Sequence, residues 1–228
     1  MQFGVLGDIH GDFGTARRIM ERHSDVPFWL CVGDVATADG RYEPLPAPLH
    51  WIKGNNENFD TIAANAFPAN LHYIPNARAV TIGSPEGLHD GRLTVAGLGG
   101  TLAPTMYELA AADLPHPKKS SGKATELADR RRHFVREEVE ACKVMTAVDI
   151  FLSHEAPRPF RVNRGIDAGK TPINEILEAM KPRLHLFGHH HKFVESTAQG
   201  VPSLCLDLVS KSYLLVDAKT LVYQHLAS

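Results

Sequence analysis

Short apolar runs rich in β-branched and aromatic residues recur along the chain, and Gly, Asp or Asn residues stand at their ends. Such runs predict β-strands, which we place at 3–6, 28–32, 49–52, 71–74, 79–82, 93–98, 149–152, 185–187, 203–206 and 213–216. An apolar period near 3.6 residues predicts helices at 15–22, 59–65, 124–142 and 172–180. Strands that alternate with helices in the first part of the chain indicate an α/β layered fold.

The longest predicted helix, 124–142, places an arginine cluster mostly between its apolar residues: Arg130, Arg131, Arg132 and Arg136. This spacing favours a solvent-facing charged surface. The preceding stretch, 99–123, has scattered Pro and Gly and then the run KKSSGK, which predicts a long surface loop. A substrate lid and a plain connector both remain open for that loop. No repeat and no linker divides the chain, so we expect one domain over residues 1–228.

Composition adds limits to this picture. A chain of 228 residues with 43% hydrophobic and 22% charged residues is long enough for one sizeable core. The net charge of -2 gives no global basic field that would bind nucleic acid non-specifically. The three cysteines form no spacing pattern, which is typical of buried thiols in a reducing compartment. With no apolar stretch long enough to span a bilayer, we expect a cytoplasmic protein.

Candidate metal ligands follow five predicted strands, where open α/β folds place their sites. Each one alone is better explained by a turn, a helix cap or a buried histidine. Together they form a set of carboxylate, imidazole and amide groups that suits a pair of divalent transition ions. The set is Asp8, His10, Asp34, Asn55, His154, His189 and His191.

The order of these motifs resembles the calcineurin-like metallophosphoesterases, whose pattern is DxH, GD, GNH[DE], a lone His and GHxH. Here the blocks read DIH at 8–10, GD at 33–34, GNNE at 54–57, His154 and GHHH at 188–191. The resemblance implies a four-layer α/β/β/α sandwich of two mixed β-sheets flanked by helices. It also implies that one metal takes Asp8, His10 and His191, that the other takes Asn55, His154 and His189, and that Asp34 bridges both.

Two cations held in this way can bind a phosphate oxygen and acidify a bridging water, which predicts phosphoester hydrolysis by a metal-bridging hydroxide. The family resemblance implies manganese first, with iron, zinc, nickel or cobalt as alternatives. The residues expected to take part in catalysis are Asp34, Asn55, Asn56 and His154. Asp12 and Glu57 lie beside the ligands, and we expect each to orient a ligand or cap a helix.

Asn56 stands where most family members have a histidine that contacts the phosphate and protonates the leaving group. An amide cannot titrate, so Asn56 is expected to donate a hydrogen bond to a phosphoryl oxygen instead. Small bacterial and archaeal relatives with GNCD at this position also lack the histidine and resemble phosphodiesterases. This departure favours phosphodiesters with leaving groups that need little protonation.

The later half of the chain is also similar to the catalytic domain of RNA lariat debranching enzymes, which hydrolyse a 2′,5′-phosphodiester. The similarity lies in DIFLSH at 149–154 and HHHKF at 189–193. Debranching enzymes carry Cys at the position of Asp8 and His at that of Asn56. The similarity implies a nucleotide-like diester, so a nucleotide or short nucleic acid fits as substrate.

A basic segment follows His154, and in it we expect Arg158 and Arg161 to contact substrate together with Asn56. A solvated charged loop is the alternative for this segment. Two other functions also remain open. One is a phosphomonoesterase or a dinucleoside polyphosphate pyrophosphohydrolase that uses the same site. The other is a non-catalytic protein-interaction scaffold that retains the fold.

Overall fold

The computed structural model describes residues 1–83, 92–116, 129–162 and 165–228. In this part of the chain the strands form two six-stranded mixed sheets. The first sheet has the order β14 (Tyr223–Ala227), β13 (Ser212–Asp217), β1 (Gln2–Leu6), β2 (Trp29–Cys31), β3 (Leu49–Trp51) and β4 (Leu71–Tyr73). The second sheet has the order β11 (Val194–Ala198), β12 (Val201–Cys205), β10 (Leu184–Phe187), β9 (Ile150–Ser153), β6 (Leu93–Leu98) and β5 (Arg78–Ile82).

Parallel pairing dominates the middle of both sheets. Strands β1, β2, β3 and β4 run parallel in the first sheet, and β6, β9, β10 and β12 run parallel in the second. The antiparallel pairs lie toward the edges, where β5 joins β6, β11 joins β12, and β13 joins β1 and β14. Parallel strands end at the same edge of a sheet, so the loops that follow them are neighbours in space.

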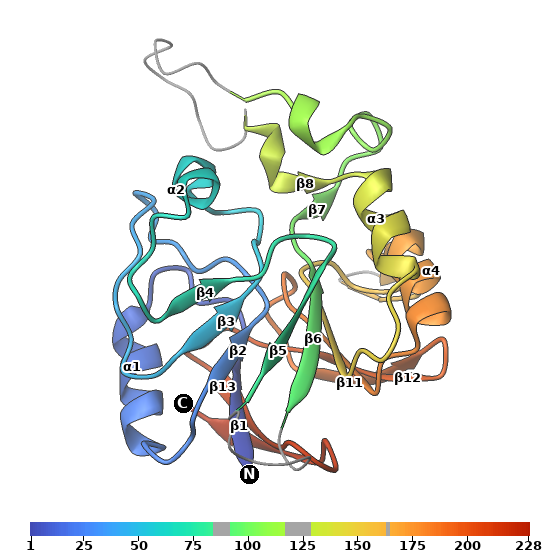
Figure 1. Cartoon of the computed structure of the whole chain (residues 1–228). Coiled ribbons are helices and arrows are strands. Elements are labelled where there is room, and N and C mark those ends of the chain that lie inside the picture. Colours follow the sequence, from blue (N-terminus) through green and yellow to red (C-terminus); the bar gives the residue numbers. More distant parts are fainter. Residues whose placement is uncertain (84–91, 117–128, 163–164) are drawn as a thin grey trace.

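Helices cover the outer face of each sheet, as Figure 1 shows. Helix α1 (Phe13–Arg22) packs on the first sheet, and α3 (Arg136–Lys143) and α4 (Thr171–Met180) pack on the second. A third cluster of buried residues, drawn from both sheets, fills the space between them. The predicted four-layer α/β/β/α sandwich is therefore confirmed.

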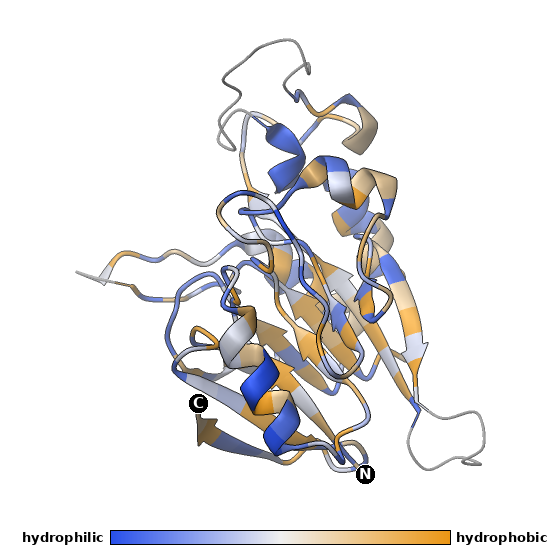
Figure 2. Cartoon of the chain, turned by 90° about the vertical axis from the view of Figure 1, so that its left-hand side faces the viewer, coloured by the Kyte–Doolittle hydropathy of each residue, from blue (hydrophilic) through white to orange (hydrophobic). Residues whose placement is uncertain are grey.

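Alternation along the strands produces these layers. In β1, Val5 points into the core between the sheets, whereas Leu6 points toward α1, because successive side chains of a strand face opposite sides. Figure 2 shows that most strand residues are hydrophobic, whereas α1 carries hydrophilic residues on its outward side. Because the central strands are buried on both faces, most of their residues are apolar, and the candidate ligands lie just past their carboxyl ends.

The helix predicted at 124–142 is wrong over the first half of its described length. Residues Arg130–Arg132 form a 3-10 turn (η3), His133–Phe134 form the short strand β8, and α3 begins only at Arg136. Residues 132–135 are four consecutive buried positions, more than the buried face of an amphipathic surface helix can include. The Glu138 side chain also accepts a hydrogen bond from the Val135 backbone N–H at 3.0 Å and fixes the start of α3. Residues 124–128 lie outside the described residues.

The loop predicted at 99–123 also contains regular structure. Strand β7 (Thr101–Leu102) pairs in parallel with β8, and Ala111–Asp113 form a short 3-10 helix (η1), while 117–123 lie outside the described residues. Helix α2 (Phe59–Ala64) follows the GNNE motif. No helix among the described residues is both long enough and apolar enough to cross a membrane.

Candidate metal centre

The predicted ligands leave the carboxyl ends of five strands and meet in one place. Asp8 and His10 follow β1, Asp34 follows β2, and Asn55 follows β3. From the second sheet, His154 follows β9, and His189 and His191 follow β10. The two sheets thus contribute ligands to a common edge, as the parallel strand order predicts.

Distances between donor atoms divide the site into two groups. In the first, His191 Nε2 lies 3.2 Å from Asp8 Oδ2 and 3.1 Å from His10 Nε2. In the second, His154 Nε2 lies 3.0 Å from Asn55 Oδ1. The ring centroids of His154 and His189 are 4.9 Å apart. These are separations that cations could fill with bonds of about 2 Å to each donor.

Asp34 lies between the two groups. Its Oδ2 atom is 3.6 Å from His10 Nε2 and 3.7 Å from His154 Nε2. Burial opposes ionisation of this carboxyl group, but the charge of His154 and the N–H groups of Asn56 outweigh it, so the pKa of Asp34 is lowered. An ionised carboxylate at this position has the geometry of a bridging ligand.

Asp8 provides a direct test of whether these residues fit a cation. Its Oδ2 accepts a hydrogen bond from the His189 backbone N–H at 2.9 Å, but its buried Oδ1 has no hydrogen-bond partner among the described residues. An unpartnered buried carboxylate oxygen is costly unless a cation or donor satisfies it. The chemistry of the donor set and this oxygen therefore both fit a divalent metal.

The imidazoles are held in forms that can bind metal. His154 Nδ1 lies 2.9 Å from the Val32 carbonyl oxygen, which can only accept, so Nδ1 donates and Nε2 is directed at Asn55 and Asp34, where loss of its proton would free a lone pair for a metal. Burial lowers the pKa of His189 to about 3, which keeps its ring neutral.

Unusual backbone conformations concentrate at this site. His10, Asp34, His189 and His191 adopt the left-handed region, with φ of 46°, 50°, 70° and 48°. Non-glycine residues rarely occupy that region, and such strain persists only where surrounding contacts hold it. Here the backbone N–H groups of Ile9 and His10 both donate to the Asp34 carbonyl oxygen, at 3.1 and 2.6 Å, and join the first two ligand loops.

Glycines in the motifs allow the chain to approach the carboxylates. A Cβ atom added at Gly54 would lie 1.9 Å from Asp34 Oδ1, and one added at Gly188 would lie 2.2 Å from Asp8 Oδ1. Neither distance is compatible with a side chain. These two glycines are therefore required for the ligand geometry.

Glu57 organises the loops that carry Asp34 and Asn55. Its buried carboxylate accepts backbone N–H bonds from Val35 at 2.9 Å, Ala36 at 3.2 Å and Gly54 at 3.2 Å, and a bond from the Tyr42 hydroxyl at 2.8 Å. In the same way Asp12 caps α1 by accepting from the Thr15 backbone N–H at 3.0 Å. Orientation by Glu57 and capping by Asp12 agree with the roles expected from the sequence.

Replacing Glu57 with glutamine should weaken both fold and metal binding. Burial and the nearby Asp34 raise the pKa of Glu57 to about 7, so the comparison belongs at pH 8, where the carboxylate is ionised. An amide nitrogen would face N–H donors, and we expect the free energy of unfolding to fall by about 2–3 kcal/mol. Metal affinity should fall about 10-fold to 100-fold. Denaturant unfolding and metal titration measure the two effects.

Tyr42→Phe is the matched control, because it removes one donor from Glu57 and leaves the carboxylate in place. It should cost about 1 kcal/mol. Equal losses in the two variants would contradict the role of the Glu57 charge.

Asn56 contacts Asp34, the candidate bridging ligand, in this structure. Its backbone N–H donates to Asp34 Oδ1 and its amide Nδ2 donates to Asp34 Oδ2, both at 2.8 Å. Sequence reasoning expected the amide to donate to a phosphoryl oxygen, and did not foresee the contact with Asp34. Both carboxylate oxygens of Asp34 are thus held from the side of the GNNE loop.

Arg158 and Arg161 do not join the other predicted residues. The Arg158 guanidinium lies 2.7 Å from Asp167 Oδ2, and Arg161 is exposed with its carbonyl oxygen accepting from Lys192 Nζ at 2.9 Å. Neither is among the described residues that line the pocket beside the ligands. Their contact with substrate stays a prediction.

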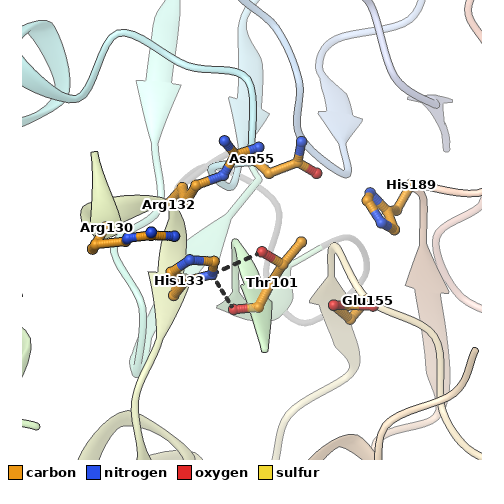
Figure 3. Close-up of a pocket in the computed structure, with 7 residues that line it drawn as sticks. All are labelled: Asn55, Thr101, Arg130, Arg132, His133, Glu155 and His189. Atoms are coloured by element: carbon orange, nitrogen blue, oxygen red, sulfur yellow. Dashed lines mark hydrogen bonds between the residues drawn. The ribbon is translucent and has the colours of Figure 1, made fainter. Parts of the chain in front are cut away.

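That pocket contains residues which sequence reasoning missed. It has a volume of about 320 Å³ and is shared by the ligands Asn55 and His189. Figure 3 shows its other walls, formed by Thr101, Glu155, Arg130, Arg132 and His133. The expectation of a solvent-facing arginine cluster is wrong for Arg132, which is only 8% exposed, because the helix that predicted it does not form.

Comparison with solved structures identifies similar folds. The crystal structure of TT1561 of Thermus thermophilus has a TM-score of 0.60 at 12% identity, covering 99% of this chain and 98% of that one. YfkN from Bacillus subtilis, a calcineurin-like phosphoesterase, has a TM-score of 0.55 at 13% identity, covering 100% and 88%. A dimetal phosphatase from Danio rerio, LOC 393393, has a TM-score of 0.54 at 12% identity, covering 100% and 98%. At these identities the likeness shows the fold alone.

Comparison of the sequence with family models and with curated proteins bears on the family of the chain. No curated protein matched the chain. The sequence model described as calcineurin-like phosphoesterase matches residues 1–193, a span that includes every residue of the candidate metal centre. With the sandwich fold and the converging ligand loops, this match shows that the chain belongs to the calcineurin-like phosphoesterase family.

Proposed function

We propose that this protein is a phosphodiesterase that uses two divalent metal ions. Metal-dependent phosphoester hydrolysis is the activity that the family implies. The observation that carries the proposal is the convergence of Asp8, Asp34 and their imidazole neighbours, with Asp8 Oδ1 buried and without a partner among the described residues. Asp8, His10 and His191 would hold one metal, and Asn55, His154 and His189 the other, with Asp34 bridging.

The bound cations would supply Lewis acidity toward phosphoryl oxygens and would lower the pKa of water. The protein residues fix the geometry for this chemistry. Asp34 spans the two groups of donors, and Asn56 and the β2 loop hold it in place. Asn55 contributes a neutral oxygen, so the site keeps more positive charge for a phosphoryl group than a further carboxylate would leave.

The preference for diesters rests on Asn56. This side chain cannot supply a proton to a leaving group, and its amide already donates to Asp34. A leaving group that departs without full protonation therefore suits the site better. We favour nucleotide-like diesters and manganese, and iron, zinc, nickel or cobalt are the alternatives for the same donor set.

A substrate panel tests the proposal. Bis-p-nitrophenyl phosphate should be hydrolysed faster than p-nitrophenyl phosphate with Mn²⁺, and EDTA should remove the activity while Mn²⁺ restores it. Metal analysis should give two ions per chain. Activity measured with iron, zinc, nickel or cobalt in place of manganese compares the alternative metals. Faster turnover of the monoester would contradict the diesterase proposal. Inertness toward both esters with two metals bound would instead support a non-catalytic scaffold.

A further inference from the structure

The candidate metal centre opens on one side into a pocket that the proposed chemistry does not use. The pocket has a volume of about 320 Å³, within the range of small-molecule sites and more than the scissile phosphate needs. Asn55 and His189 form its metal side. In Figure 3, Arg130 and Arg132 lie on the side of the pocket away from His189. We call this space the arginine pocket.

The three consecutive arginines of η3 differ in their partners. Arg131 donates to both Asp129 and Asp60, within a set of ion pairs outside the pocket. Arg132 is only 8% exposed, yet its guanidinium has no hydrogen bond or ion pair with any residue in the described ranges. Arg130 likewise lacks such a partner there. A nearly buried charge without a counter-ion is costly, which indicates that an anion occupies the pocket in the working state.

A second buried group in the same wall also lacks a partner. His133 is 8% exposed, and its Nδ1 lies 3.0 Å from Thr101 Oγ1 and 3.2 Å from the Thr101 carbonyl oxygen. Its Nε2 is buried and has no partner among the described residues. Because the Thr101 carbonyl oxygen can only accept, Nδ1 donates and Nε2 is left as an unsatisfied acceptor, which a hydroxyl group of a bound ligand would satisfy.

The backbone under the arginines is held rigidly to the metal side. The buried Lys53, two residues before Asn55, donates to the Arg131 and His133 carbonyl oxygens at 2.8 and 3.1 Å. Gly100 approaches so closely that an added Cβ would lie 2.5 Å from the Arg132 carbonyl oxygen. The arginine pocket is thus preorganised relative to Asn55, as a binding site requires.

The carboxylate of Glu155 also lines the pocket, but its negative charge is offset by Lys170. Glu155 accepts from the Leu102 backbone N–H at 3.1 Å and lies 3.7 Å from Lys170 Nζ. Because Lys170 offsets its charge, Glu155 does not neutralise the two arginines. The pocket keeps a net positive wall, and planar guanidinium groups are well matched to phosphate oxygens.

We propose that the arginine pocket binds a second phosphoryl group of the substrate through Arg130 and Arg132. This inference rests on the proposed function and narrows its substrate class to phosphoesters that carry another phosphate beside the one being hydrolysed. A 5′-phosphorylated dinucleotide and a nucleoside polyphosphate both present that chemistry.

Matched substrates test the inference. We compare the dinucleotide pApA with ApA, which differ by one terminal phosphate, and measure kcat/KM with Mn²⁺. The parent protein should prefer pApA by about tenfold or more, the value of one charged hydrogen bond. Arg132→Gln and Arg130→Gln should each lower the pApA to ApA ratio about tenfold. Arg136→Gln is the control, because Arg136 pairs with Glu108 on the surface and should leave the ratio unchanged.

A polyphosphate arm separates the two sources of a second phosphate. If the pocket binds a phosphate of a polyphosphate chain, the arginine variants should hydrolyse diadenosine tetraphosphate more slowly than the parent protein. If the pocket binds the phosphate of a neighbouring nucleotide, the variants should instead hydrolyse pApA more slowly. The inference would be overturned if the parent protein preferred neither pApA nor diadenosine tetraphosphate over ApA. It would also be overturned if both arginine variants kept the parental ratio of kcat/KM for pApA to that for ApA. Thermal unfolding of each variant confirms that the fold is intact, and Arg130 provides an exposed position should Arg132→Gln fail to fold.

Direct binding keeps this test separate from the proposed function. Calorimetry with ADP and AMP should give about tenfold tighter binding of ADP to the parent protein and no such difference in Arg132→Gln. If no substrate is hydrolysed with two metals bound, the proposed function fails, but this comparison still decides the inference. Equal affinity of the parent for ADP and AMP would overturn it.

Discussion

Asp34→Asn should lower kcat/KM for bis-p-nitrophenyl phosphate by on the order of 10³-fold or more and should release at least one metal ion. Asp34 Oδ2 lies 3.6 Å from His10 Nε2 and 3.7 Å from His154 Nε2, so it approaches both groups of donors. Asparagine would offer a single neutral oxygen and lose the bridge. Metal content after gel filtration and steady-state kinetics measure both effects.

The second reason for a large effect lies in the contacts around Asp34. Its two oxygens accept from the Asn56 backbone N–H and from Asn56 Nδ2. After the substitution an NH₂ group must replace one of these acceptors, so a donor would face a donor. The side chain would then rotate or shift, and the geometry that the Asn56 contacts fix would be lost.

Asp39→Asn is the matched control for this substitution. Asp39 is exposed, pairs with Arg41 and lies on the chain shortly after Asp34. It should retain parental activity and metal content. If Asp34→Asn kept two metals and a parental rate, the assignment of Asp34 as a bridging ligand would be refuted.

The candidate site was largely predictable because of where its residues stand in the sequence. Each ligand follows an apolar run, and buried parallel strands such as β2 and β10 end with their loops at a common edge. Asp34 follows Cys31 and Val32, and His189 follows Phe187, so the change from apolar to polar marks the strand end. The local pattern was therefore enough to predict that these distant residues meet at one edge of the sheets.

What the sequence did not predict depends on contacts between distant segments. Arg132 is buried because Lys53 and Gly100 hold the backbone where η3 passes into the strand β8, and neither contact is visible in local periodicity. Edge strands β11 and β14 were missed for a different reason. Their residues are mostly exposed and polar, as in VESTA at Val194–Ala198, so backbone pairing with β12 and β13 defines them.

Asn56→His should increase hydrolysis of phenyl phosphate, a monoester whose leaving group is much more basic than p-nitrophenolate, by about 10²-fold, the lower end of the contribution of a general acid. The imidazolium would stand beside the phosphate and protonate the leaving oxygen of the monoester. Because this acid acts only when protonated, kcat/KM should fall as pH rises through its pKa, near 6.5 for an unperturbed histidine, with a loss of about tenfold per pH unit above it. The parent protein, with an amide at this position, should lack that descending limb. The pH profile of monoester hydrolysis from about pH 5 to about pH 9 measures the difference.

The gain is expected to stay below the full range because Asn56 also holds Asp34. The backbone N–H contact to Oδ1 survives the substitution, whereas the side-chain contact from Nδ2 to Oδ2 does not. Asn56→Ala isolates that cost, since it removes the same contact and adds no acid. We expect Asn56→Ala to lose diesterase activity without any new limb in its pH profile. A histidine variant whose profile matches that of Asn56→Ala would show that this position does not face the leaving group.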